Sequence, residues 1–77
     1  MTEATLEKLE EVVVREQITW IAENFGKEAC ERANYGWGVD STSTTVVVST
    51  KVYGHGVLTS SLTVGDEEPT HLFKPFK

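Results

Sequence analysis

The chain is poor in the residues that hold small proteins together through covalent or metal bonds. Its 77 residues include one cysteine, Cys30, and two histidines. A single cysteine excludes an internal disulfide, and the lack of a CxxC pair or a dense Cys/His cluster argues against structural zinc. Small domains without such links often gain stability from a second subunit. We therefore expect one small domain over residues 1–77, stabilised further as a homodimer.

Long apolar runs and a basic amino-terminal segment are also missing. The sequence starts with MTEATLEKLEE, which is acidic from its third residue and lacks the apolar stretch of a signal peptide. No apolar run approaches the ~20 residues that a helix needs to span a bilayer. With one thiol and no export signal, a cytoplasmic location is expected.

Positive charge is scarce in the first half of the chain. The formal net charge is −5, and residues 1–34 carry most of the acidic excess. An acidic helix repels nucleic acid phosphates and anionic membranes, so we expect no direct contact with either. The partner that this charge favours is a protein with a basic surface.

Proline is absent before position 69, and the segment from Thr2 to about Asn34 has the pattern of a helix. Gly26 interrupts this segment. It either closes a first helix at Phe25 or is a tolerated interior glycine. We favour one helix with a bend at Gly26, because the apolar spacing continues across the glycine.

Apolar residues form two stripes along this helix. The first has spacings of 4, 3, 4 and 4, and we expect it to cover a sheet; its members are Val14, Ile18, Ile21, Phe25 and Ala29. The second lies about 100° or more away around the helix axis, and its members are Leu6, Leu9, Val13 and Trp20. A single helix on a small sheet needs one stripe, so the second is predicted to meet a dimer mate or a binding partner. The alternative is that its leucines only wrap the edge of the core.

From Thr44 the apolar period changes to two. Two β-branched runs joined by GHG predict an antiparallel hairpin with strands 44–53 and 57–64. The faces predicted to meet the helix carry Val46, Val48, Thr50 and Val52 on one strand and Leu58, Ser60, Leu62 and Val64 on the other. A lone hairpin is marginal in water, so a third strand is expected from residues 37–40, residues 71–73 or another chain. The predicted fold class is α+β, with a long N-terminal helix packed on a small antiparallel sheet.

Two aromatic residues lie among glycines in the junction NYGWGVD, residues 34–40. A glycine here can end the helix. We expect Trp37 to pack over the open end of the helix and sheet layers, and Tyr35 to be the more exposed of the two. Tyr35 is therefore the candidate aromatic anchor for a partner, because tyrosine is enriched in interface hot spots.

No catalytic or metal-binding constellation is evident. The stretch DEEPTH, residues 66–71, offers carboxylates and an imidazole, but three adjacent acids cannot all face one ion on an ordinary backbone path. Cys30 lies among acids, which oppose a reactive thiolate. His55 sits between glycines in the hairpin turn and is expected to be solvated. We therefore predict no metal, no cofactor, no catalytic residue and no enzymatic activity.

These features favour a non-catalytic protein-interaction module, an acidic inhibitor that binds a basic, nucleic-acid-binding surface of a target protein. The candidate partner-binding residues are Glu7, Glu10, Glu11, Leu9, Val13, Trp20 and Tyr35. In size, acidity and lack of motifs the chain resembles phage-encoded inhibitors of host defence, including anti-CRISPR proteins, and this resemblance is one of overall character. The alternative is a self-assembling structural or virion-associated homo-oligomer.

Overall fold

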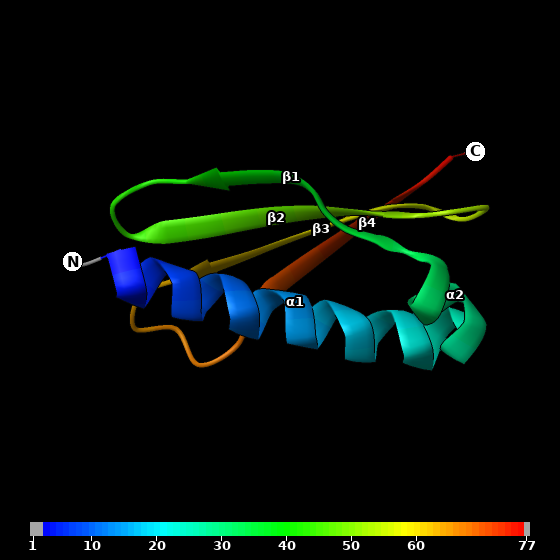
Figure 1. The fold of residues 1–77 in the computed structure, drawn as a ribbon, viewed down its shortest axis with the longest axis horizontal. Coiled ribbons are helices and arrows are strands. Elements are labelled where there is room, and N and C mark those ends of the chain that lie inside the picture. Colours follow the sequence, from blue (N-terminus) through cyan, green and yellow to red (C-terminus); the bar gives the residue numbers. More distant parts are fainter. Residues whose placement is uncertain (1–2, 77) are drawn as a thin grey trace.

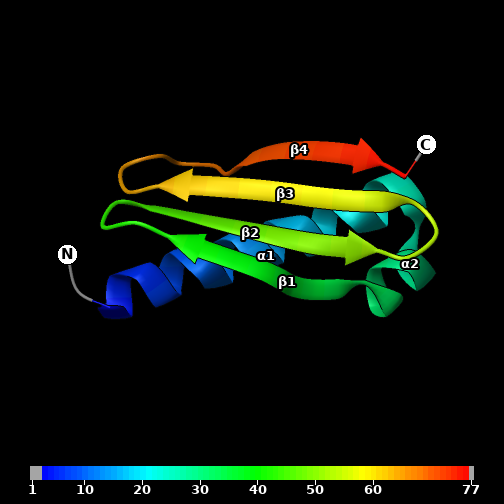
Figure 2. The ribbon, with the colours of Figure 1, turned by 90° about the horizontal axis from the view of Figure 1, so that it is seen from above.

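The computed structural model describes the backbone of residues 3–76 and the side chains of residues 7–76, so the predicted start of the helix at Thr2 lies outside it. The elements are α1 (Glu3–Phe25), α2 (Lys27–Arg32), β1 (Asn34–Ser41), β2 (Thr45–Val52), β3 (Gly56–Thr63) and β4 (Thr70–Pro75). The strands form one antiparallel sheet in the order β1-β2-β3-β4, and α1 runs along one face of it (Figure 1 and Figure 2). The predicted α+β class with a long N-terminal helix is confirmed.

The predicted hairpin is present as β2 and β3, whose pairing runs from Thr45 opposite Thr63 to Val52 opposite Gly56. Both segments named as sources of a third strand take part, residues 37–40 within β1 and residues 71–73 within β4. The sheet therefore has four strands, one more than the hairpin with a third strand that was expected, and β1 and β4 form its two edges.

The helical segment is broken at Gly26, which corrects the expectation of one bent helix reaching Asn34. Gly26 has a φ of 95°, in a region that glycine enters at little cost, so α1 ends before it and α2 begins after it. Its N–H donates to the Ala22 carbonyl (3.1 Å) and its carbonyl accepts from the Cys30 N–H (3.2 Å). The chain changes direction here while both backbone groups of the glycine stay hydrogen-bonded.

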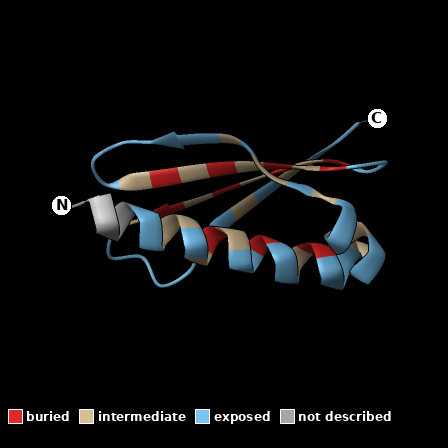
Figure 3. Cartoon of the chain, viewed as in Figure 1, coloured by how far each residue is buried: buried red, intermediate tan, exposed pale blue. Residues whose placement is uncertain are grey.

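The core lies where α1 meets the sheet, and Figure 3 shows the buried residues alternating along the strands that it covers. Two clusters make it up. In the first core cluster, Val13 packs with Val46, Val48 and Leu62. In the second core cluster, Ile21 packs with Val52 and Leu58, and aromatic residues surround them.

The covering face of α1 contains members of the predicted second stripe, which is a correction. Val13 is completely buried. Ile21 is buried as expected, but Ile18 is 40% exposed. Val14 and Phe25 are only half-buried. The helix is therefore rotated about its axis relative to the prediction, so that Val14 and Ile18 of the first stripe lie on its flank.

A buried polar side chain sets this rotation of α1. Gln17, at the centre of the buried face, is 0% exposed. Gln17 Nε2 donates to the carbonyls of Val48 (3.0 Å) and Leu58 (3.3 Å) and to Ser60 Oγ (3.1 Å). Its Oε1 accepts a hydrogen bond from Thr50 Oγ1 at 2.6 Å. Among the described side chains, every buried nitrogen and oxygen has a hydrogen-bond partner. Because Gln17 is polar, apolar periodicity alone leaves it out and divides the residues around it into two stripes, one on each side.

The two junction aromatic residues have the opposite of their predicted exposures. Trp37 is 61% exposed and does not pack over the end of the layers. Tyr35 is half-buried beside the second core cluster, and its hydroxyl donates to the Cys30 carbonyl at 2.7 Å. Burial raises the pKa of Tyr35, and its hydrogen bond with the side chain of Cys30 (3.2 Å to Sγ) raises it further. The pairing of β1 with β2 is irregular over residues 34–38, so a simple alternation of faces does not hold across this junction.

Candidate functional site on helix α1

One flank of α1 stays outside the core and forms a shallow depression of about 610 Å³. We call it the acidic flank, and it is lined by Glu7, Glu10, Glu11, Val14, Arg15 and Ile18. Helix geometry explains its position. Val14 and Ile18 each follow a completely buried residue, Val13 or Gln17, and one residue is a rotation of about 100°. Both side chains therefore emerge beside the core.

The acidic flank carries three carboxylates and one guanidinium. Glu7, Glu11 and Arg15 are exposed, and Glu10 is half-buried. The ion pairs found among the described side chains lie elsewhere, within α2. The flank therefore presents an excess of negative charge that is not used in holding the fold together.

Apolar surface lies next to these charges. Ile18 is 40% exposed and Val14 is half-buried. Along the helix, Glu7, Glu11, Val14 and Ile18 follow one another at spacings of 4, 3 and 4, the spacing along which a second helix packs. The flank thus combines a charged end with an apolar end on one line.

The structure brings three of the seven predicted partner-binding residues together, namely Glu7, Glu10 and Glu11. Val13 is buried against the sheet, which corrects its expected exposure to a partner. Leu9 packs half-buried on the first core cluster.

The remaining predicted residues lie away from the flank. Trp20 and Tyr35 are half-buried against the second core cluster. The side chain of Leu6, a member of the same predicted stripe, lies outside the described residues. Val14 and Ile18 were not predicted as surface residues, although a helical wheel centred on Gln17 places both beside the buried face.

Neither metal-site geometry nor membrane-spanning character is found in the part of the chain that the structure describes. No group of three or more His, Cys, Asp or Glu side chains there is arranged to hold an ion. Neither helix, over residues 3–76, offers an apolar stretch suited to crossing a membrane. Comparisons with protein-family models, with curated proteins and with solved structures found no match in any of the three.

Proposed function

We propose that this chain is a non-catalytic protein-interaction module whose acidic flank binds a basic surface of a target protein. The supporting observation is that the carboxylates of Glu7, Glu10 and Glu11 share one depression with the apolar side chains of Val14 and Ile18. Carboxylates steer a basic partner and fix its orientation. The apolar pair adds surface that leaves water on binding, which favours association.

The surface that fits best is a helix or ridge on which lysines or arginines flank small apolar side chains. Its cations would lie over the amino-terminal part of the flank, and its apolar residues would lie over Val14 and Ile18. The 4-3-4 spacing of the flank suits a partner helix running alongside α1.

A target that uses this basic surface for nucleic acid would be inhibited, because one surface cannot hold phosphates and α1 together. This is the behaviour of the anti-defence, anti-CRISPR type of inhibitor. The formal net charge of −5 supports the competition, since the chain would replace phosphates as the source of negative charge.

Charge reversal tests the proposal. Each Glu→Lys change adds two charges, so reversing Glu7, Glu10 and Glu11 together moves the formal net charge from −5 to +1. Reversing Glu23, Glu67 and Glu68 instead, all outside the flank, gives the same net charge and serves as the matched control. A target captured from host lysate with the parent chain is identified, purified and titrated with each variant.

We expect the flank variant to bind at least ~10-fold more weakly and the control to stay within ~3-fold of the parent at 0.15 M salt. Raising the salt concentration should weaken the parent complex. Equal losses in the two variants would show that net charge, rather than the flank, governs binding. An affinity that changes neither with the salt concentration nor with the charge reversals on the flank would refute the proposal.

A second candidate function, self-assembly as a structural homo-oligomer, is favoured by the edges of the sheet. Trp37 and Val39 on β1 are 61% and 49% exposed, and Leu72 on β4 is 57% exposed. Edge strands that carry exposed apolar side chains are common sites of pairing between chains. Sedimentation decides between the two functions: a monomer supports the inhibitor, whereas an oligomer that Val39→Lys or Leu72→Lys dissociates supports assembly.

A further inference from the structure

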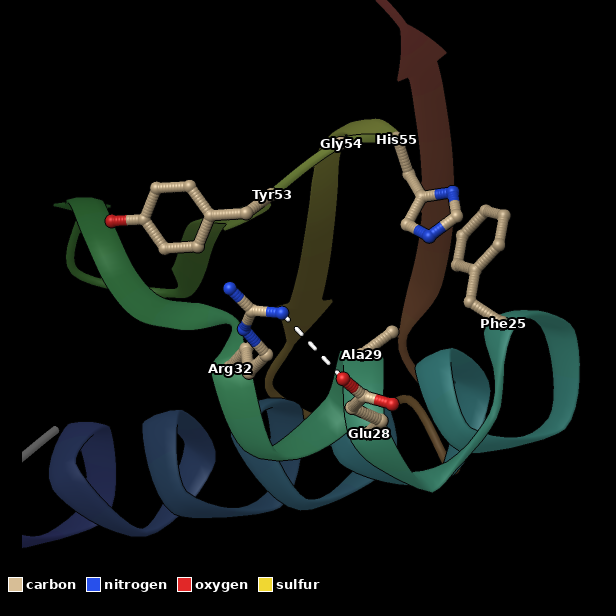
Figure 4. A pocket seen from close by; sticks show the side chains of 7 residues that line it. All are labelled: Phe25, Glu28, Ala29, Arg32, Tyr53, Gly54 and His55. Carbon is tan, nitrogen blue, oxygen red and sulfur yellow. Dashed lines mark ion pairs between the residues drawn. The ribbon is translucent and has the colours of Figure 1, made fainter.

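A second concavity lies where α2 meets the turn between β2 and β3 (Figure 4). We call it the hairpin cleft. It has a volume of about 370 Å³ and is lined by Phe25, Glu28, Ala29, Arg32, Tyr53, Gly54 and His55. Small-molecule sites begin at roughly 300 Å³. The cleft is therefore large enough for one aromatic ring with a short acid group, and none of its residues belongs to the acidic flank.

Backbone contacts hold the hairpin wall of this cleft in place. Gly54 has a φ of 82°, which permits the tight turn between Tyr53 and His55. The His55 N–H donates to the Val52 carbonyl at 3.0 Å, and the Phe76 N–H donates to the His55 carbonyl at 3.1 Å. Because the turn is bonded on both sides, the wall exists before any ligand arrives.

The floor of the cleft is aromatic. The rings of Phe25 and His55 are stacked, with centroids 4.2 Å apart and planes 20° apart. Phe25 also contacts the rings of Trp20 and Phe73, at centroid distances of 5.8 and 5.2 Å. In Figure 4, Phe25 lies on the side of His55 away from Arg32, so the other side of the imidazole is turned toward the cleft. That surface is suited to a planar ring.

The charge of the cleft comes from one ion pair. Arg32 Nη1 lies 3.5 Å from Glu28 Oε1, and the two side chains are 73% and 85% exposed. An exposed pair of this kind contributes little to stability, so Arg32 can turn to a ligand anion at small cost. A guanidinium binds a carboxylate in a planar, two-point geometry.

We propose that the hairpin cleft binds a planar aromatic group that bears a single carboxylate, with the ring against His55 and the carboxylate on Arg32. One negative charge fits better than two, because the cleft has one guanidinium and the nearby Glu28 carboxylate would repel a phosphate dianion. The same chemistry is offered by a free aryl carboxylate and by an aromatic residue at the carboxyl end of a peptide. The proposal is independent of partner binding at the acidic flank.

The test is a titration of the ¹⁵N-labelled full chain, followed by amide chemical shifts. The probes are phenylacetate, N-acetylphenylalanine, N-acetylphenylalanine amide and phenyl phosphate. Both carboxylates should shift the amides of Arg32, Gly54 and His55 saturably, with a Kd of about 1 mM, as one ring contact and one ion pair allow. The amide and the phosphate should bind at least ~5-fold more weakly. A threefold preference for N-acetylphenylalanine identifies the peptide source, and otherwise the free acid is the ligand.

Three substitutions complete the design. Arg32→Gln should weaken carboxylate binding at least fivefold, whereas Lys27→Gln, which removes the same charge from α2 outside the cleft, should leave it unchanged. Glu28→Gln should strengthen it about twofold by removing the repelling carboxylate. Binding of the amide as tight as that of the acid, in the unmodified protein, would overturn the proposal. So would an affinity that is indifferent to Arg32→Gln, or one that Lys27→Gln lowers equally.

Discussion

Replacing Gln17 with leucine tests whether the buried hydrogen-bond network holds α1 on the sheet. Leucine has a similar size but forms no hydrogen bonds. The Thr50 hydroxyl loses the acceptor at 2.6 Å, and Ser60 Oγ loses the donor at 3.1 Å but keeps its contact with His71 Nδ1. A buried polar group left without a partner costs about 1–3 kcal/mol. The apolar side chain offsets part of this loss, so we expect Gln17→Leu to lower the free energy of unfolding by about 2 kcal/mol.

That loss is large for a domain of this size, whose total stability is about 4–12 kcal/mol. Urea unfolding followed by tryptophan fluorescence measures this loss. The free energy of unfolding falls by ~1 kcal/mol per molar urea, so the midpoint should fall by about 2 M. The control is the double variant in which Thr50→Val accompanies Gln17→Leu, because removing the orphaned Thr50 hydroxyl removes its penalty. Thr50→Val alone should be destabilising, since it orphans Gln17 Oε1. A Gln17→Leu chain as stable as the parent, or a double variant no more stable than the single one, would refute the reasoning.

Two further predictions concern the orientation of α1 and the ionisation of Tyr35. Val13→Glu should unfold the chain, because it places an unpaired charge in the first core cluster. Ile18→Glu should keep the parent circular dichroism spectrum and impair only partner binding. The reverse pattern would show that the helix faces are misassigned. The raised pKa of Tyr35 means that the unfolded chain ionises first, near pH 10, so stability should fall as the pH rises above that value and the fall should be smaller in Tyr35→Phe. The urea midpoint of each protein at pH 8 and at pH 10.5 measures this fall. An equal fall of the midpoint in the parent and in Tyr35→Phe would contradict the prediction.

The strands could be predicted where the chain alternates cleanly, and they were hidden where it does not. Residues 45–63 carry β-branched side chains with period two, and β2 and β3 follow that pattern closely. β1 contains glycines at 36 and 38 and pairs irregularly over residues 34–38. Its side chains therefore show no regular alternation from which a strand could be predicted. β4 is short and ends at Pro75, which leaves few residues to show a period. Both edge strands were therefore proposed only as fragments, from the need to complete the sheet.

The acidic part of the candidate site could be predicted, because charge is visible in the sequence whatever the orientation of the helix. Glu7, Glu10 and Glu11 were expected at the surface and lie together there. Its apolar part could not be predicted from spacing alone, since both apolar stripes of α1 have helical periodicity. The hairpin cleft was invisible for a different reason. It depends on the reversal of the chain at Gly26, which brings Arg32 to the turn that carries His55.

The choice between the two stripes was nevertheless encoded, in the sheet rather than in the helix. The predicted inner face of the hairpin carries two hydroxyls, at Thr50 and Ser60, among aliphatic side chains. Covering them with the stripe of Val14 and Ile18 would leave the Thr50 hydroxyl without an acceptor and Ser60 Oγ with only its contact to His71 Nδ1. A buried polar group without a partner costs about 1–3 kcal/mol. Gln17 is the amide side chain at the middle of the helix that can satisfy both at once, and only a rotation that buries Val13 and Ile21 on either side of it allows this. Two polar residues on the sheet thus decide which apolar face of α1 is core and which is left exposed beside it.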